Sequence, residues 1–278
     1  MTNSEFVPRR NPLKTFQLSD SRFERDGLRQ ITIKSASLRG RGDITVWMPP
    51  SIDIAQPLPL VILLHGVYGS HWAWSMNGGA HITARRLLDE GRIRQMALVM
   101  PSDGLWGDGT GYVNHSERDY ETWIADEVPW AVRQIISPKQ RNIAPLFISG
   151  LSMGGFGAMR IGAKYGKSRF LGISGHSSVT EFSEMKKFVE EPLSLYSNVS
   201  ASDLSVLNTI LANRHNLPTL RFDCGQSDPL RRGNRALHSA LEANAIPHTY
   251  EEFSGTHEWA YWETHLADTL LFFEACLR

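Results

Sequence analysis

The sequence predicts an α/β fold with a mostly parallel central sheet and helices on both faces. Strand-like apolar runs alternate with helix-like segments from residue 60 to the C-terminus, which is the order that such a sheet requires. Residues 28–38 and 43–50 alternate apolar and polar positions around a turn that holds two glycines, which predicts an antiparallel strand pair at the start. Residues 144–160, APLFISGLSMGGFGAMR, join an apolar run, a sharp turn with Ser152 at its apex, and a Gly-rich helix-like segment.

Length and composition favour one folded unit. The chain has 278 residues, of which 41% are hydrophobic and 21% charged, and open α/β sheets often reach about 250 residues as one domain. We therefore expect a polar tail over residues 1–27 and one domain over residues 28–278, with a small insertion at about 177–216. The two cysteines, Cys224 and Cys276, match neither a disulfide framework nor zinc-ligand spacing, so both are expected to be buried apolar residues.

Charge and hydropathy exclude several partners. The 29 basic residues balance 29 acidic residues, so no overall field favours nucleic acid or an anionic membrane. The N-terminus lacks the apolar segment of a secretory signal, and no run approaches the roughly 20 apolar residues of a membrane span. These patterns predict a cytoplasmic protein without nucleic-acid or membrane partners.

The remaining elements follow from local patterns. The continuous apolar run at 60–64 predicts a central strand that is covered on both faces. Further strands are expected at 96–102, before Ser152, and at 170–175, 219–224 and 248–254, and helices at 81–91, 117–136, 154–166, 231–245 and from about 258 to 277. Pro129 lies inside the segment 117–136 and is expected to kink that helix or to mark its restart.

Three polar residues follow three different strands. Ser152 lies in Gly150-Leu151-Ser152-Met153-Gly154, and a G-x-S-x-G sequence is informative when a strand precedes it and a helix follows. Asp228 comes directly after strand 219–224, and His257 comes directly after strand 248–254. Functional groups of a parallel α/β sheet gather at the carboxyl ends of its strands. The order Ser, Asp, His therefore indicates a nucleophile, an acid and a base.

Other residues compete for two of these roles. Asp223 is a rival acid, but it falls inside the strand, whereas Asp228 follows it. The alternative role for Asp228 is that of an N-cap of the next helix. The rival bases are His65, His115, His176 and His265. His65 precedes the turn Gly66-Val67-Tyr68-Gly69, a position better suited to building an oxyanion hole, and His176 is the strongest competitor. His257 has its own alternative as a loop histidine that caps the last helix.

Six motifs in one order resemble a known family. They are LLHG at 63–66, MPSDG at 100–104, DYETWIADEVP at 119–129, GLSMGG at 150–155, the acidic run at 223–228 and GTHEWAYWETHL at 255–266. From about residue 30 to the C-terminus the chain is similar to the putative-esterase family of α/β-hydrolases, which includes S-formylglutathione hydrolases, feruloyl and acetylxylan esterase domains, tributyrin esterases and mycolyltransferases. The resemblance implies an α/β-hydrolase fold with Ser152 as nucleophile, His257 as base and Asp228 as acid. It also implies an oxyanion hole formed by the backbone N–H groups of Val67 and Met153.

The expected function is that of a serine esterase that works through an acyl-enzyme and needs no cofactor or metal. The expected partner is a small-molecule ester with a short acyl or aromatic group, with a carbohydrate-linked ester as one option; the oligomeric state stays open. An acyltransferase would use the same triad. An S-formylglutathione hydrolase is disfavoured, because Val67-Tyr68-Gly69 stands where that group usually has Leu-Thr-Cys. A non-catalytic scaffold would usually have lost a triad residue, and none is lost here.

Aromatic residues cluster near the expected site. The candidate substrate contacts are Trp72, Trp74, Trp106, Tyr112 and Trp259, with Trp262 close to the base. An aryl or sugar platform and simple loop packing fit these clusters equally well.

Overall fold

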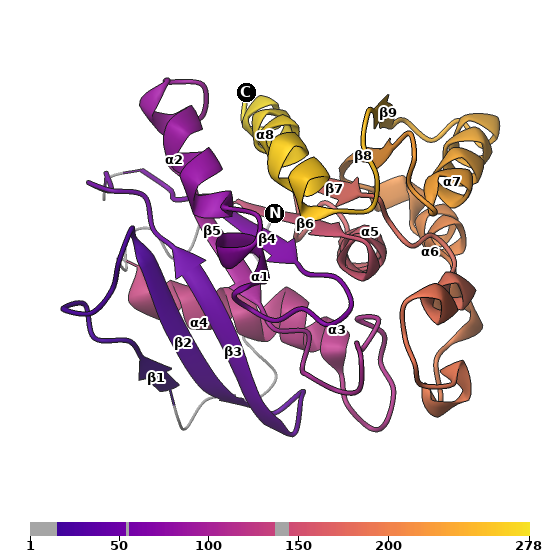
Figure 1. The fold of residues 1–278 in the computed structure, drawn as a ribbon, viewed down its shortest axis with the longest axis horizontal. Helices are drawn as coiled ribbons and strands as arrows, with labels where there is room; N and C mark the ends of the chain where they lie inside the picture. Colours follow the sequence, from indigo (N-terminus) through magenta and orange to yellow (C-terminus); the bar gives the residue numbers. More distant parts are fainter. Residues whose placement is uncertain (1–15, 54–55, 137–144) are drawn as a thin grey trace, which may run out of the picture.

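The computed structural model describes residues 16–53, 56–136 and 145–278. The strands in these ranges form a single nine-stranded sheet (Figure 1). The strand order is β1-β2-β3-β5-β4-β6-β7-β8-β9. The antiparallel part consists of β1 (Phe16–Leu18), β2 (Leu28–Ser35) and β3 (Gly40–Trp47), and β3 also runs antiparallel to β5 (Ala97–Pro101). The parallel part continues from β5 through β4 (Leu60–Leu64), β6 (Leu146–Leu151), β7 (Gly172–His176), β8 (Thr219–Gly225) and β9 (Thr249–Phe253). The predicted α/β fold with an antiparallel start is confirmed.

Two apolar layers enclose the sheet. Helices α2 (Ala80–Asp89) and α8 (Trp259–Ala275) pack together on one face (Figure 1), where Leu87, Leu266 and Phe273 are buried. The opposite face is covered by α4 (Val128–Ile135), α5 (Met153–Tyr165), α6 (Val206–Ala212) and α7 (Arg231–Ala243). Every residue of β4, β6 and β7 is buried. A continuous apolar run such as Leu60–Leu64 is stable there because both of its faces leave water.

The segment predicted as one helix over 117–136 is helical without a break from Tyr120 to Ile135, but its winding changes just before Pro129. It comprises α3 (Tyr120–Thr122), a π-helical turn (Trp123–Glu127) and α4, with Pro129 in the first turn of α4. Proline lacks an N–H, so the carbonyl of Ala125, four residues earlier, receives no bond from it. The guanidinium of Arg169 donates to that carbonyl instead, with its Nε at 2.9 Å. The helix thus continues through Pro129, with a π-helical turn directly before α4 in place of the expected kink or restart.

The start of the chain and the region after β7 complete the description. Phe16–Leu18, which lie within the range expected as a tail, add β1 to the edge of the sheet, and residues 1–15 lie outside the described residues. The expected insertion at 177–216 consists of α6 and 3-10 turns at Phe182–Lys187, Leu193–Leu195, Ala201–Leu204 and Arg214–Asn216. The short helix α1 (Ala73–Met76) follows β4. Cys224 is buried as expected, whereas Cys276 is partly exposed.

In the described ranges, no helix combines the length and the apolar character needed to cross a bilayer.

Candidate active site

Ser152 occupies a strained turn between β6 and α5. Its backbone has φ 54° and ψ −120°, a conformation that L residues rarely adopt and that costs about 1–3 kcal/mol. The last residue of β7 and the loop after it hold this turn through the two backbone groups of Ser152. The N–H of Ser152 donates to the carbonyl of His176 at 2.9 Å, and the N–H of Val179 donates to the carbonyl of Ser152 at 3.1 Å. The hydroxyl is thereby fixed at the carboxyl edge of the sheet.

The two glycines of the G-x-S-x-G sequence have steric reasons to be glycine. A Cβ on Gly150 would lie 2.2 Å from the carbonyl oxygen of Gly154, and a Cβ on Gly154 would lie 2.3 Å from the carbonyl oxygen of Leu64. Both obstacles are backbone atoms, which cannot rotate away as a side chain can. The close approach of α5 to β4 and β6 therefore depends on these positions.

The structure brings the three predicted residues together. His257 Nε2 lies 3.0 Å from Ser152 Oγ, and His257 Nδ1 lies 2.9 Å from Asp228 Oδ2. The second oxygen of Asp228 accepts the N–H of Leu230 at 2.8 Å, which fixes the carboxylate. The side chain of Asp228 is fully buried and that of His257 is 16% exposed. This arrangement can transfer a proton from a hydroxyl to an imidazole whose orientation a carboxylate holds.

The rival pair Asp223 and His176 lies beside this site and has other partners. His176 Nδ1 is 2.9 Å from Asp223 Oδ2, and both side chains are fully buried. Asp223 also accepts from Arg221 at 2.6 Å and from the hydroxyl of Tyr261 at 2.8 Å. Burial raises the pKa of Asp223, but the charges and hydrogen bonds of His176 and Arg221 outweigh it and lower that pKa to about 2. The hydroxyl of Thr269 lies 2.9 Å from His176 Nε2, but Thr269 and His176 are both 0% exposed, so this hydroxyl is closed off from a substrate. The pair therefore belongs to a buried polar network.

The other rival histidines are also engaged elsewhere. His115 lies in an aromatic cluster with Trp106, Tyr120 and Tyr196, where burial lowers its pKa to about 4. His265 Nδ1 contacts Asp268 Oδ2 on the same helix at 2.8 Å.

His65 supports the turn that follows β4. Its Nε2 accepts the N–H of Asp103 at 3.1 Å, so its Nδ1 carries the proton and donates to the carbonyl of Gly66 at 2.7 Å. A Cβ on Gly69 would lie 2.5 Å from this ring nitrogen, which shows how tightly the turn closes over His65. Among the hydrogen bonds of the described residues, none uses the N–H of Val67 or of Met153. Both donors are thus available to a ligand.

The five candidate substrate contacts divide into two groups. Trp74 and Tyr112 are 1% and 0% exposed, so they belong to the framework, contrary to the expectation from sequence. Trp74 Nε1 donates to the carbonyl of Leu64 at 2.9 Å, and the Tyr112 hydroxyl donates to the carbonyl of His65 at 3.2 Å. Trp72 is 42% exposed, and Trp106 and Trp259 are half-buried.

Sequence reasoning missed Phe188. Its ring stacks on the imidazole of His257, with centroids 5.0 Å apart and an angle of 22° between the planes. Phe188 belongs to the insertion, in a polar stretch without strand or helix periodicity, so no sequence pattern connects it with His257.

Comparison with known proteins identifies the class of this fold. Solved structures with similar folds include a ferulic acid esterase, with a TM-score of 0.75 and 22% identity, covering 94% of this chain and 99% of that one. They also include the S-formylglutathione hydrolase of Staphylococcus aureus, with a TM-score of 0.72 and 21% identity, covering 92% and 98%. The fold is therefore that of the α/β-hydrolases.

The family follows from the sequence comparisons. The model of the family described as "Putative esterase" matches residues 35–273, and the chain belongs to this family. It is also 26% identical over 232 residues to an acetyl esterase of Caldicellulosiruptor saccharolyticus, which covers 77% of this chain and 82% of that protein. The protein is accordingly an esterase.

Proposed function

We propose that this esterase is a serine carboxylic-ester hydrolase that works through an acyl-enzyme. The observation that carries the proposal is the continuous hydrogen-bonded chain from Ser152 Oγ through His257 to Asp228, at 3.0 and 2.9 Å. A hydroxyl becomes a useful nucleophile when an adjacent base, itself oriented by a third group, can remove its proton.

In the first half of the reaction, Ser152 Oγ bonds to the ester carbonyl carbon while its proton passes to His257 Nε2. Asp228 keeps the imidazole in orientation and stabilises the cation that forms. The developing oxyanion accepts from the N–H groups of Val67 and Met153, and such a donor typically contributes about 10²–10³ in rate. The carbon–oxygen bond to the alcohol then breaks, and the alcohol oxygen takes the proton from His257.

In the second half, a water molecule replaces the alcohol. His257 takes a proton from this water, whose oxygen attacks the acyl carbon, and the bond to Ser152 Oγ breaks as the proton returns to the serine. The products are a carboxylic acid and the regenerated enzyme.

We propose short acyl or aromatic esters as substrates, with carbohydrate-linked esters among them. The likeness to an acetyl esterase and to a ferulic acid esterase supports this class, as does the exposed ring of Trp72 after the oxyanion turn. A thioester substrate has weaker support, because Val67-Tyr68-Gly69 replaces Leu-Thr-Cys. Rates on nitrophenyl esters of increasing acyl length, methyl ferulate and acetylated xylan separate these classes.

A transferase would pass the acyl group to an alcohol instead of water. Hydrolysis with a carbohydrate acceptor present distinguishes the two outcomes: free acid supports the hydrolase, and acylated acceptor supports the transferase.

The nucleophile can be tested directly. A fluorophosphonate is expected to label Ser152, and Ser152→Ala is expected to lower kcat by about 10⁴ or more with an unchanged fold. The variant Ser168→Ala, at an exposed serine whose hydroxyl donates to the carbonyl of Tyr165, is the matched control and should keep both labelling and activity. Correctly folded protein that is neither labelled nor active would refute the proposal.

A further inference from the structure

The imidazole of His257 is held in two different ways. Its hydrogen bonds to Ser152 and Asp228 are made by the two ring nitrogens, whose N–H and lone pair point along the plane of an imidazole ring. Such bonds resist tilting of the ring out of its plane only weakly, so that motion must be limited by groups packed against the ring faces. Among the described aromatic side chains, Phe188 and Trp262 contact this ring.

These two contacts differ in geometry and in origin. Trp262 meets the imidazole edge-on, at 88° and 5.0 Å between centroids, and it lies on α8, next to the loop that carries His257. Phe188 lies nearly parallel to the imidazole and comes from the insertion. We propose that Phe188 is a positioning residue for His257, a role that rests on the proposed function of the triad. It limits the tilt of the imidazole, so that Nε2 stays aligned with Ser152 Oγ.

Phe188 can limit the tilt of the imidazole only if its own backbone is held in place, and hydrogen bonds at and after Phe188 hold it. The N–H of Phe188 donates to the carbonyl of Met185 at 2.8 Å. The segment that follows is tied to the loop after β5 by two reciprocal bonds. The N–H of Glu190 donates to Asp108 Oδ2 at 2.6 Å, and the N–H of Asp108 donates to Glu191 Oε1 at 3.0 Å. The backbone around Phe188 is therefore hydrogen-bonded to the loop after β5.

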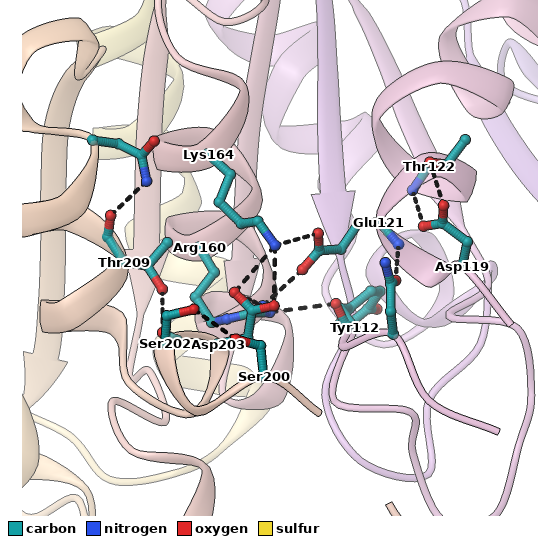
Figure 2. Close-up of polar contacts among 12 residues, drawn as sticks. Tyr112, Asp119, Glu121, Thr122, Arg160, Lys164, Ser200, Ser202, Asp203 and Thr209 are labelled. Carbon is teal, nitrogen blue, oxygen red and sulfur yellow. Dashed lines mark hydrogen bonds and ion pairs between the residues drawn. The ribbon is translucent and has the colours of Figure 1, made fainter. Parts of the chain in front are cut away.

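A second attachment connects the insertion with the helix of the nucleophile. Figure 2 shows Arg160 and Lys164 of α5 between Glu121 of α3 and Asp203 of the insertion. Lys164 Nζ lies 2.7 Å from Glu121 and 3.1 Å from Asp203, and Arg160 Nη2 lies 2.7 Å from Glu121 and 3.3 Å from Asp203. Arg160 is fully buried, so this charged cluster binds the insertion to α5 with little screening by water.

A third attachment is aromatic. The hydroxyl of Tyr196 donates to the carbonyl of Gly109, and its ring packs on Trp106 and Phe182 with centroids 5.0 and 4.9 Å apart. These three attachments hold the insertion next to the site, where the ring of Phe188 contacts His257.

Three variants of Phe188 test the proposal in steady-state assays with a nitrophenyl acyl ester. Phe188→Ala is expected to lower kcat by about 10–100-fold, because a small misplacement of a catalytic group has an effect of this size, with a smaller change in KM. Phe188→Tyr keeps the flat ring and is expected to restore kcat to within about threefold of wild type. Phe188→Leu keeps apolar packing but lacks a flat face, and it is expected to recover thermal stability without recovering kcat.

The contrast between stability and rate separates positioning from simple packing. If Phe188 only fills space, kcat will return together with Tm in Phe188→Leu, and the proposal fails. The proposal fails equally if Phe188→Ala keeps the wild-type kcat. Leu195→Ala is the matched control, because Leu195 is in the same insertion and 48% exposed, and its kcat should not change. Wild-type protein that is inactive towards all esters and fluorophosphonates would instead refute the proposed function, and the role of Phe188 with it.

Discussion

Asp223 and Asp228 show how two acids of one strand-and-loop segment acquire different tasks. Asp223 lies within β8, where Arg221, His176 and Tyr261 surround its carboxylate. Asp228 lies beyond the end of the strand, where one oxygen contacts His257 and the other accepts a backbone N–H. The carboxylate that follows the strand reaches the site, and the one inside the strand supports the layer beneath it.

This difference predicts opposite effects of the same substitution. Asp228→Asn should lower kcat by about 10⁴ with little loss of stability, because the amide no longer holds His257 in the required tautomer. Asp223→Asn should instead destabilise the fold by about 3–5 kcal/mol, because buried Arg221 loses its buried charge partner and keeps only the partly exposed Glu251. Esterase kinetics and denaturant unfolding of both variants check the prediction. A loss of kcat in well-folded Asp223→Asn that matches the loss in Asp228→Asn would contradict the assignment.

The insertion is attached to the scaffold by buried charges. Its residue Asp203 shares the cations of Arg160 and Lys164 with Glu121 of α3 (Figure 2). The two positive and two negative side chains compensate each other in a region where Arg160 has no access to water. The insertion is therefore connected to the scaffold by charge as well as by apolar contacts.

Removal of one charge from this cluster should weaken the attachment. Asp203→Asn is expected to destabilise the protein by about 1–3 kcal/mol, because the cations of Arg160 and Lys164 would then share the single carboxylate of Glu121. The insertion should also become easier to cleave in limited proteolysis. Asp89→Asn removes the exposed ion pair of Arg85 and Asp89 and serves as the matched control, with an expected change below about 0.5 kcal/mol. Equal effects of the two substitutions would show that the cluster is no more important than a surface pair.

At the scale of the whole molecule, the loops at the carboxyl edge of the sheet are packed against one another. His115 lies where they meet, 2% exposed among the rings of Trp106, Tyr120 and Tyr196. Burial is the main reason why its pKa falls from 6.5 to about 4. The folded protein thus holds this imidazole neutral in a pH range where the unfolded chain would bind a proton.

The sign of the resulting pH dependence follows from proton linkage. Because the unfolded state binds more protons between about pH 6.5 and about pH 4, the free energy of unfolding should fall as the pH is lowered through this range. The contribution of His115 should be about 1–3 kcal/mol, allowing for partial screening by solvent. His115→Phe should make the pH dependence shallower, as measured by urea unfolding. The difference between wild type and variant should stay constant from pH 7 to 8, and an unchanged slope in the acid range would contradict the prediction.

The framework and the three central site residues were predictable because their signals are local. Leu60–Leu64 is continuously apolar, and a strand with that pattern must be covered on both sides. Ser152, Asp228 and His257 each follow a strand, and parallel strands bring such positions to one edge. The expected disturbance at Pro129 was equally local, since it follows from a missing N–H; the structure has a π-helical turn before α4 there, not a kink or a restart.

The surroundings of the triad were not predictable in the same way. In the sequence, Trp72, Trp74 and Tyr112 were equally good candidates for a substrate platform. In the structure, Trp74 and Tyr112 are buried, whereas Trp72 is exposed. Phe188 had no signal at all, although it stacks on His257.

From the sequence we could predict the succession of strands and helices, the sharp turn at Ser152 with its glycines, and the three polar residues that follow strands at the sheet edge. Only the tertiary structure decided which aromatic rings face His257 and which support the loops from below. The physical reason is that backbone conformation and strand burial depend on neighbouring residues in the chain. The direction of a loop side chain depends instead on packing against segments that are distant in sequence, as Phe188 does through the attachments of its insertion to α3, α5 and the loop after β5.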